Sequence, residues 1–106
     1  MDFKRPRKRI ESLESNKLRR YMEERGWLVK KLHGGKYQSG FPDLVAMHLK
    51  HGLRWIETKA PGGKLRPSQR RFFAVMSTHG QLIFVLHSVK DYPLLFSKYD
   101  NWMSYI

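Results

Sequence analysis

Two apolar segments of the sequence carry charged residues that a protein interior rarely contains. Residues 40–47 (GFPDLVAM) include Asp43, and residues 54–60 (RWIETKA) include Glu57 and Lys59. A buried charge is unfavourable unless a partner compensates it. A divalent cation held between Asp43 and Glu57 would offset the repulsion between the two carboxylates. Because Mg²⁺ prefers oxygen ligands, the pattern predicts a magnesium site.

Such a site suits the hydrolysis of a phosphodiester bond. A metal ion polarises a phosphoryl oxygen, lowers the pKa of a bound water and stabilises the leaving oxygen. We expect Lys59 to orient the attacking water or to stabilise the developing negative charge. The opposing interpretation is that Glu57 and Lys59 form a surface ion pair, which would contribute little. Under that interpretation Asp43, which follows Pro42, would only cap a turn.

The spacing of these residues predicts how a sheet would bring them together. Side chains two apart on a strand share a face, so Glu57 and Lys59 project together. The sequence KHG at residues 50–52 predicts a tight turn between two antiparallel strands. Counting outward from this turn places Asp43 opposite the end formed by Lys59 and Ala60, to within a residue or two. At that register, Asp43 and Glu57 can share one ligand.

The chain of 106 residues has room for one domain with one modest core. Hydrophobic periodicity predicts the order helix, three strands, helix, strand, which is a single-domain α/β fold with a mixed sheet flanked by helices. The last strand follows a helical connection, so we expect it to pair parallel to a neighbour. The expected segments are a basic arm at 1–9 and a domain at 10–106, with helices at 10–25 and 68–79 and strands at 27–32, 41–49, 53–60 and 81–88.

The first expected helix carries an acidic residue where apolar residues are expected. Its inward stripe comprises Ile10, Leu13, Leu18, Tyr21 and Met22. At about 100° per residue, Glu14 falls near the middle of this stripe and Glu11 falls at its edge. We therefore expect Glu14 to add a metal ligand, directly or through water. The alternative is that Glu14 extends out of the stripe or pairs with a lysine.

The charge balance indicates an anionic partner. Twenty-one Lys and Arg face nine Asp and Glu, which gives a formal net charge of +12. Nucleic acid is the first candidate, because phosphate contacts supply most sequence-independent affinity. A solvated basic surface and an anionic membrane face are the alternatives. No apolar run is long enough to span a membrane, and the lack of cysteine excludes disulfides and thiolate zinc sites.

Three stretches extend the pattern into a family resemblance. The sequences QSGFPDLVA, IETKAPGGKLRPSQRRF and THGQLIFVLHS resemble the VRR-NUC family, a replication-repair nuclease domain of the PD-(D/E)XK superfamily. The resemblance extends from about Glu11 to Ser88 and implies a DNA endonuclease that depends on Mg²⁺ or Mn²⁺. By that resemblance, the metal ligands are Asp43, Glu57 and the backbone carbonyl of Thr58, the catalytic lysine is Lys59, the acid of the first helix is Glu14, and a glutamine near the scissile phosphate is Gln69. Gln69 could instead only cap the start of its helix.

The resemblance also implies partners. Stand-alone members of the family resemble bacterial or phage homodimers that act on branched DNA such as Holliday junctions, so we expect a cytoplasmic repair nuclease of that kind. The basic residues expected to contact DNA phosphates are Lys36, Lys64, Arg66, Arg70 and Arg71. Two rival functions remain: a basic nucleic-acid-binding module that cuts nothing, and a restriction-type endonuclease for plain duplexes. The C-terminal aromatic tail is expected either to cover the core or to form the dimer interface.

Overall fold

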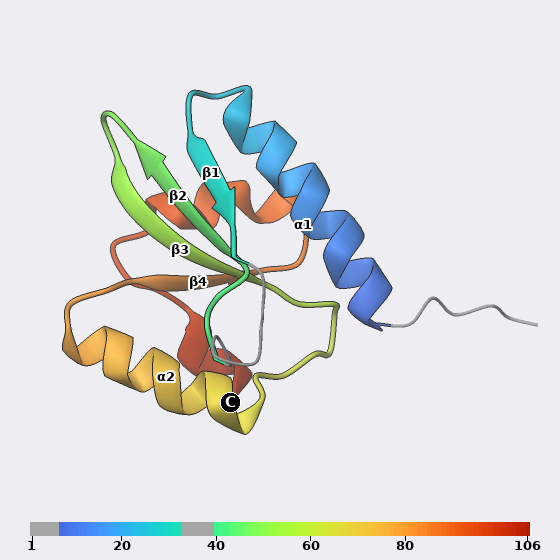
Figure 1. Cartoon of the computed structure of the whole chain (residues 1–106), viewed down its shortest axis with the longest axis vertical. Coiled ribbons are helices and arrows are strands. Elements are labelled where there is room, and N and C mark those ends of the chain that lie inside the picture. The colour runs from blue at the N-terminus through green and yellow to red at the C-terminus, as the bar shows by residue number, and fades with distance from the viewer. Residues whose placement is uncertain (1–6, 33–39) are drawn as a thin grey trace, which may run out of the picture.

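Four strands form one mixed sheet with α-helices on both faces (Figure 1). The computed structural model describes residues 7–32 and 40–106. In chain order, these residues form α1 (Arg7–Glu23), β1 (Leu28–Lys31), β2 (Leu44–His48), β3 (Gly52–Thr58), α2 (Pro67–Thr78), β4 (Ile83–Leu86) and two 3-10 helices, η1 (Val89–Phe96) and η2 (Trp102–Tyr105). The strand order is β1-β2-β3-β4. The α/β class is therefore confirmed, as is the parallel pairing of the last strand, since β4 pairs parallel to β3.

The helix α1 begins at Arg7, within the segment expected to be an arm. It packs on the sheet through Leu18 and Met22, which lie four residues apart on one face and are both fully buried. The helix ends near Gly26, whose φ of +90° suits a residue without a side chain. The Trp27 amide, just beyond this glycine, donates to the Met22 carbonyl at 3.1 Å. The chain then turns directly into β1.

The hairpin between β2 and β3 has a different register from the one expected. His48 pairs with Gly52, which leaves a turn of Leu49, Lys50 and His51. The turn is thus centred on Lys50 rather than on His51, and Leu44 pairs with Ile56. Extending that register by one residue places Asp43 opposite Glu57, two residues from Lys59 and thus within the range that the count allowed. The shift arises because Gly52, with a φ of +78°, belongs to the strand rather than to the turn.

The strand β4 is buried on both faces, which explains its uninterrupted apolar sequence. Phe84 and Leu86 face one apolar cluster, which α1 and η1 complete, and Ile83 and Val85 face the other, which α2 and η2 complete. The first cluster comprises Leu18, Met22, Trp27, Val29, Leu44, Ala46, Ile56, Phe84, Leu86 and Leu95. The second comprises Leu65, Phe73, Met76, Ile83, Val85 and Trp102.

The C-terminal tail closes the outer edge of β4 with side chains. The amide of Ile83 donates to Asp100 Oδ2 at 2.9 Å, and the amide of Val85 donates to Asn101 Oδ1 at 2.7 Å. Asn101 Nδ2 returns a hydrogen bond to the Val85 carbonyl at 2.9 Å. Trp102 is buried against Phe73. Of the two alternatives for the tail, Trp102 therefore follows the first, because it covers the core.

Candidate active site

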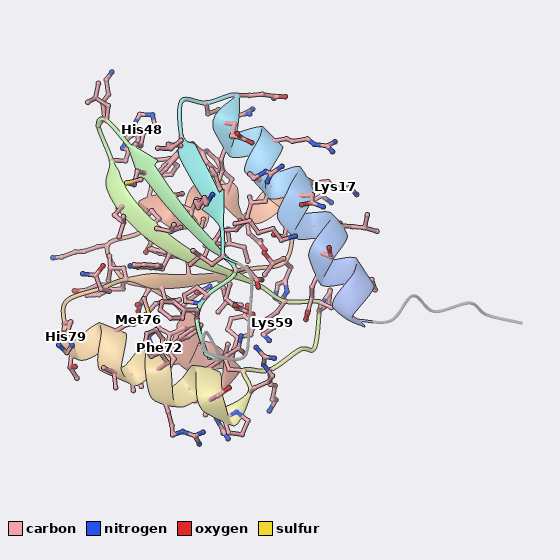
Figure 2. All side chains as sticks on the ribbon, viewed as in Figure 1. Lys17, His48, Lys59, Phe72, Met76 and His79 are labelled. Atoms are coloured by element: carbon pink, nitrogen blue, oxygen red, sulfur yellow. The ribbon has the colours of Figure 1, made fainter. Side chains whose placement is uncertain are left out.

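The structure brings Asp43, Glu57 and Lys59 together at the end of the sheet where β2 begins and β3 ends. Asp43 Oδ2 accepts a hydrogen bond of 2.9 Å from the Thr58 amide. Glu57 Oε2 lies 3.3 Å from Lys59 Nζ. The side chains of this ion pair are only 3% and 8% exposed, so the surface interpretation of the pair does not apply. Figure 2 shows Lys59 in the space between α1 and the loop that leads into α2.

Burial and the charges of neighbouring acids raise the pKa of both carboxyl groups. Burial, together with the charge of Asp43, raises the pKa of Glu57 from 4.5 to about 7, although Lys59 and Gln69 lower it in part. Burial also raises the pKa of Asp43, with Glu11 adding to the effect and the Thr58 amide opposing it. Glu57 Oε1 has no hydrogen-bond partner of good geometry. Three carboxyl groups (Glu11, Asp43 and Glu57) share this site with two lysines (Lys31 and Lys59), so their full ionisation would leave an excess of negative charge.

Gln69 connects this group to α2. Its side chain is almost fully buried, and its Oε1 accepts a 3.0 Å hydrogen bond from the amide of Arg66, the residue at the N-cap of α2. Its amide approaches Glu57 closely enough to lower the pKa of that carboxyl group. Gln69 thus caps its helix and contacts the acidic group at once, while its position near the scissile phosphate stays a prediction.

The acid of α1 that reaches the site is Glu11 rather than Glu14. Glu11 Oε1 accepts a hydrogen bond of 3.2 Å from the amide of Ala60, and its charge raises the pKa of Asp43. Glu14 instead pairs with Lys17 at 3.5 Å, and Figure 2 shows Lys17 on the side of α1 that faces away from Lys59. The placement of Glu14 in the acidic group was wrong, and its pairing with a lysine is the alternative that the geometry supports. Glu11 and Glu14 are separated by about 4.5 Å along the helix axis and by about 60° around it, which is enough for only one of them to reach the site.

A small cavity of about 170 Å³ opens beside Asp43. It is lined by Glu11, Ser12, Ser15 and Lys31 as well as by Asp43. The hydroxyl of Ser15 is buried without a hydrogen-bond partner, and the charge of Lys31 lowers the pKa of Asp43. The sequence patterns missed Ser12, Ser15 and Lys31. The alternation along β1 would have given one signal, since Lys31 shares a face with the buried Val29.

Two glycines let the loops approach the site. Pro61 and Gly62 form the centre of a tight turn in which the Gly63 amide donates to the Ala60 carbonyl at 2.8 Å, and Gly62 has a φ of +79°. This combination is typical of a type II turn. Gly40 has a φ of +95°, and a Cβ there would lie 2.7 Å from the Ser68 carbonyl oxygen. The segment before β2 and the first turn of α2 therefore meet closely.

The basic residues expected to contact phosphates cluster around the start of α2. Lys64, Arg66 and Arg71 are exposed and Arg70 is partly so. Within residues 7–32 and 40–106, none of the four takes part in an ion pair. Lys36 lies outside the described residues. Arg66, Arg70 and Arg71 lie within three residues of Gln69, whose side chain contacts Glu57.

The sheet with its helices and the Asp43, Glu57 and Lys59 group define the class of protein as a nuclease-type fold of the PD-(D/E)XK kind. The VRR-NUC domain matches residues 4–90, which is most of the sequence. The chain therefore belongs to the VRR-NUC family. A solved structure described as a VRR-NUC domain is similar, with 27% identity and a TM-score of 0.71 over 85% of this chain and 97% of that chain. Among curated proteins, none matches this sequence.

Membership in this family makes nuclease activity the general expectation and DNA the implied partner. In the described parts of the chain, no helix is long and apolar enough to cross a membrane. The matched region ends at residue 90, so most of η1 and all of η2 lie beyond it. The tail that closes the edge of β4 thus lies outside the matched region.

Proposed function

We propose that this chain is an endonuclease that uses Mg²⁺ or Mn²⁺ to hydrolyse DNA phosphodiester bonds. The observation that carries the proposal is the buried pair of Glu57 and Lys59 beside Asp43. Removing such charges from water costs free energy that an ion pair alone rarely recovers. A protein that needs them for a cation and a phosphate group has a reason to retain them.

The residues fit a hard divalent cation. The acidic group has an excess of negative charge, and Glu57 Oε1 lacks a partner that a cation would provide. Among the residues that the structure describes, no three Asp, Glu or His side chains form a ready cage. Mg²⁺ does not need one, because it commonly binds through one or two carboxylates and keeps several waters. We propose Asp43 and Glu57 as side-chain ligands and the Thr58 carbonyl as a third ligand, with Glu11 in place of Glu14 as an acid that acts through water.

Each side chain then has a separate task in hydrolysis. A bound divalent cation supplies a polarised phosphoryl oxygen and a more acidic water. The Lys59 ammonium group, held beside Glu57, is placed to donate to the attacking water or to a phosphoryl oxygen. Gln69 fixes the orientation of Glu57 from the opposite side, through the first turn of α2. Lys64, Arg66, Arg70 and Arg71 would hold the DNA backbone against this group.

We further propose that the enzyme acts on branched DNA, including Holliday junctions, as a homodimer in the cytoplasm of a bacterial or phage-infected cell. An exposed row of Leu28, Met47 and Leu53 supports dimerisation. The three residues are cross-strand neighbours on β1, β2 and β3, and their side chains remain accessible. We call them the apolar row. An isologous contact through this row would give two active sites related by a two-fold axis, as paired cuts in a junction require.

The test is a cleavage assay with labelled four-way junction, flap, plain duplex and single-stranded DNA in Mg²⁺, Mn²⁺ or EDTA. We expect metal-dependent cuts in branched substrates and little cleavage of the plain duplex. Cleavage confined to particular duplex sequences would favour the restriction-type alternative. Tight, salt-sensitive binding without cleavage in either metal would favour the non-catalytic binding module.

A further inference from the structure

On its carbonyl side, the backbone of Lys59 is held by a side chain rather than by a neighbouring strand. The strand β3 ends at Thr58, one residue before this lysine. The Lys59 amide still donates to the Leu86 carbonyl at 3.0 Å. Its carbonyl oxygen, however, lies 2.6 Å from Nδ1 of His87, and the next amide, that of Ala60, donates to Glu11. The position of Lys59 in the site therefore depends on a histidine and a carboxylate.

The partners of His87 fix which ring nitrogen carries the proton. A carbonyl oxygen can only accept, so Nδ1 must donate to Lys59. In the neutral ring, Nε2 is then an acceptor, and it lies 3.0 Å from the Tyr105 hydroxyl. Burial and the charge of Asp91 raise the pKa of Tyr105, which keeps the hydroxyl protonated as a donor. The hydrogen bonds thus run in one direction, from Tyr105 through His87 to Lys59.

The tail segment that carries Tyr105 is anchored to α2 and to the loop before it. Its backbone carbonyl accepts a 2.8 Å hydrogen bond from the amide of Leu65, in the loop between β3 and α2. Trp102, in the same short helix η2, is buried and donates from Nε1 to Ser77 Oγ at 3.1 Å. The amide of His87 donates to Asp91 Oδ2 at 2.7 Å. Both ends of the Tyr105–His87 pair are therefore anchored, although Tyr105 lies outside the region that the family match covers.

We propose that His87 and Tyr105 are positioning residues for Lys59, so that the C-terminal tail takes part in assembling the active site. This role rests on the proposed function, in which Lys59 serves the reaction. Neither residue needs to touch DNA or the metal. Loss of the tether should let Lys59 move relative to Glu57, which lowers the rate at saturating substrate and leaves the affinity for DNA unchanged.

Three variants distinguish this positioning role from a role that only stabilises the fold. Tyr105→Phe removes one hydroxyl, and we expect kcat to fall about two- to tenfold while KM for junction DNA stays constant. His87→Leu removes the donor to Lys59 and should lower kcat further. His87→Asn places an amide N–H near the position of Nδ1 and should recover most of the activity. Tyr105→Phe should add nothing in the His87→Leu background, because the pathway is already broken.

The assay is run well below the melting temperature of every variant. If all variants keep the wild-type kcat there, the pair is only structural and the inference is overturned. Equal losses in His87→Asn and His87→Leu would also contradict it, as would additive effects of the two sites. If wild-type protein cleaves no DNA in any metal, the proposed function fails and this role fails with it. If the wild-type protein cleaves DNA and Tyr105→Phe keeps the wild-type kcat, this inference is overturned while the proposed function stands.

A second measurement does not depend on cleavage. Long-range ¹H–¹⁵N correlation spectra of histidine-labelled protein report which ring nitrogen carries the proton. We expect His87 in the Nδ1–H form, with an Nε2 resonance that shifts in Tyr105→Phe and stays in place in Tyr99→Phe, the matched control on an exposed tyrosine. The Nε2–H form would overturn the proposal, because that ring could not donate to the Lys59 carbonyl.

Discussion

The two ends of the sheet depart from the usual distribution of side chains in opposite ways. One end buries charged side chains, and the other exposes apolar ones. At the end where β3 finishes, Glu57 and Lys59 are charged yet only 3% and 7% exposed. At the other end, the apolar row of Leu28, Met47 and Leu53 is 66%, 43% and 38% exposed. Buried charge and exposed apolar surface each lower the stability of an isolated chain.

The difference between the ends suggests two kinds of missing partner. The polar end carries an excess of carboxyl groups in spite of a chain with a net charge of +12, so we propose a compact cation as its partner. The apolar row carries no charge, so we propose an apolar surface as its partner, for which a second copy of the same row is suitable. The predictions below separate the two ends.

The largest effect is expected at the polar end. Asp43→Asn should reduce cleavage by at least ~10³-fold, because an amide is a poor ligand for a divalent cation. In EDTA at neutral pH the same variant should melt at a higher temperature than wild type, since it removes one of two repelling buried charges while it can still accept from the Thr58 amide. Glu24→Gln removes the same charge at an exposed position, so it should change neither the cleavage rate nor the melting temperature. A destabilised Asp43→Asn protein would contradict the account of excess negative charge.

The next effect is expected at the apolar row. Met47→Glu should weaken self-association by about 100-fold, because a charge would be buried between two copies. Leu49→Glu is the matched control, since Leu49 is also exposed but lies in the hairpin turn outside the row. Sedimentation equilibrium of the three proteins measures the difference. A wild-type monomer, or a Met47→Glu dimer of unchanged affinity, would exclude the row as the interface.

A smaller effect distinguishes the two acids of α1. Glu11→Gln should reduce cleavage about 10- to 100-fold, as is usual for groups that orient metal ligands. Glu14→Gln should stay within about twofold of wild type, because its partner is the exposed Lys17. Initial rates at several Mg²⁺ concentrations measure both variants. The opposite order of the two effects would restore Glu14 to the site.

The smallest effect is the pH dependence of stability without metal. Glu57 holds its proton more tightly in the folded state, where its pKa is about 7, than at its ordinary 4.5. This contribution to folding is complete below about pH 4.5 and is lost as the pH rises through 7, on the order of a few kcal/mol. Melting in EDTA should therefore shift downward from pH 5 to pH 8, and Mg²⁺ should stabilise more at the higher pH. Glu57→Gln should flatten this slope, whereas an upward shift in wild type would refute the assignment.

The residues that were predictable from the sequence are those set by local periodicity. Asp43, Glu57 and Lys59 were placed together because strand alternation and one hairpin determine their relation. The choice between Glu11 and Glu14 was not predictable in this way, since both lie near the same stripe and the crossing of α1 over the sheet decides between them. The hairpin register differs slightly from the expected one because the turn is centred one residue earlier. Gly52, with its positive φ, belongs to the strand. The contact of His87 with Tyr105 joins residues 18 positions apart through the packing of the tail, which no periodic pattern encodes.

The way in which the tail covers β4 also limits how the chain can be shortened. A fragment that stops at residue 90, where the family match ends, would lack Asp91, Asp100 and Asn101 and would expose the backbone groups of Ile83 and Val85. These groups would form an open template to which a strand of another molecule could add. We therefore expect the trimmed fragment to aggregate by intermolecular strand addition, even though it retains all of the acidic residues of the site.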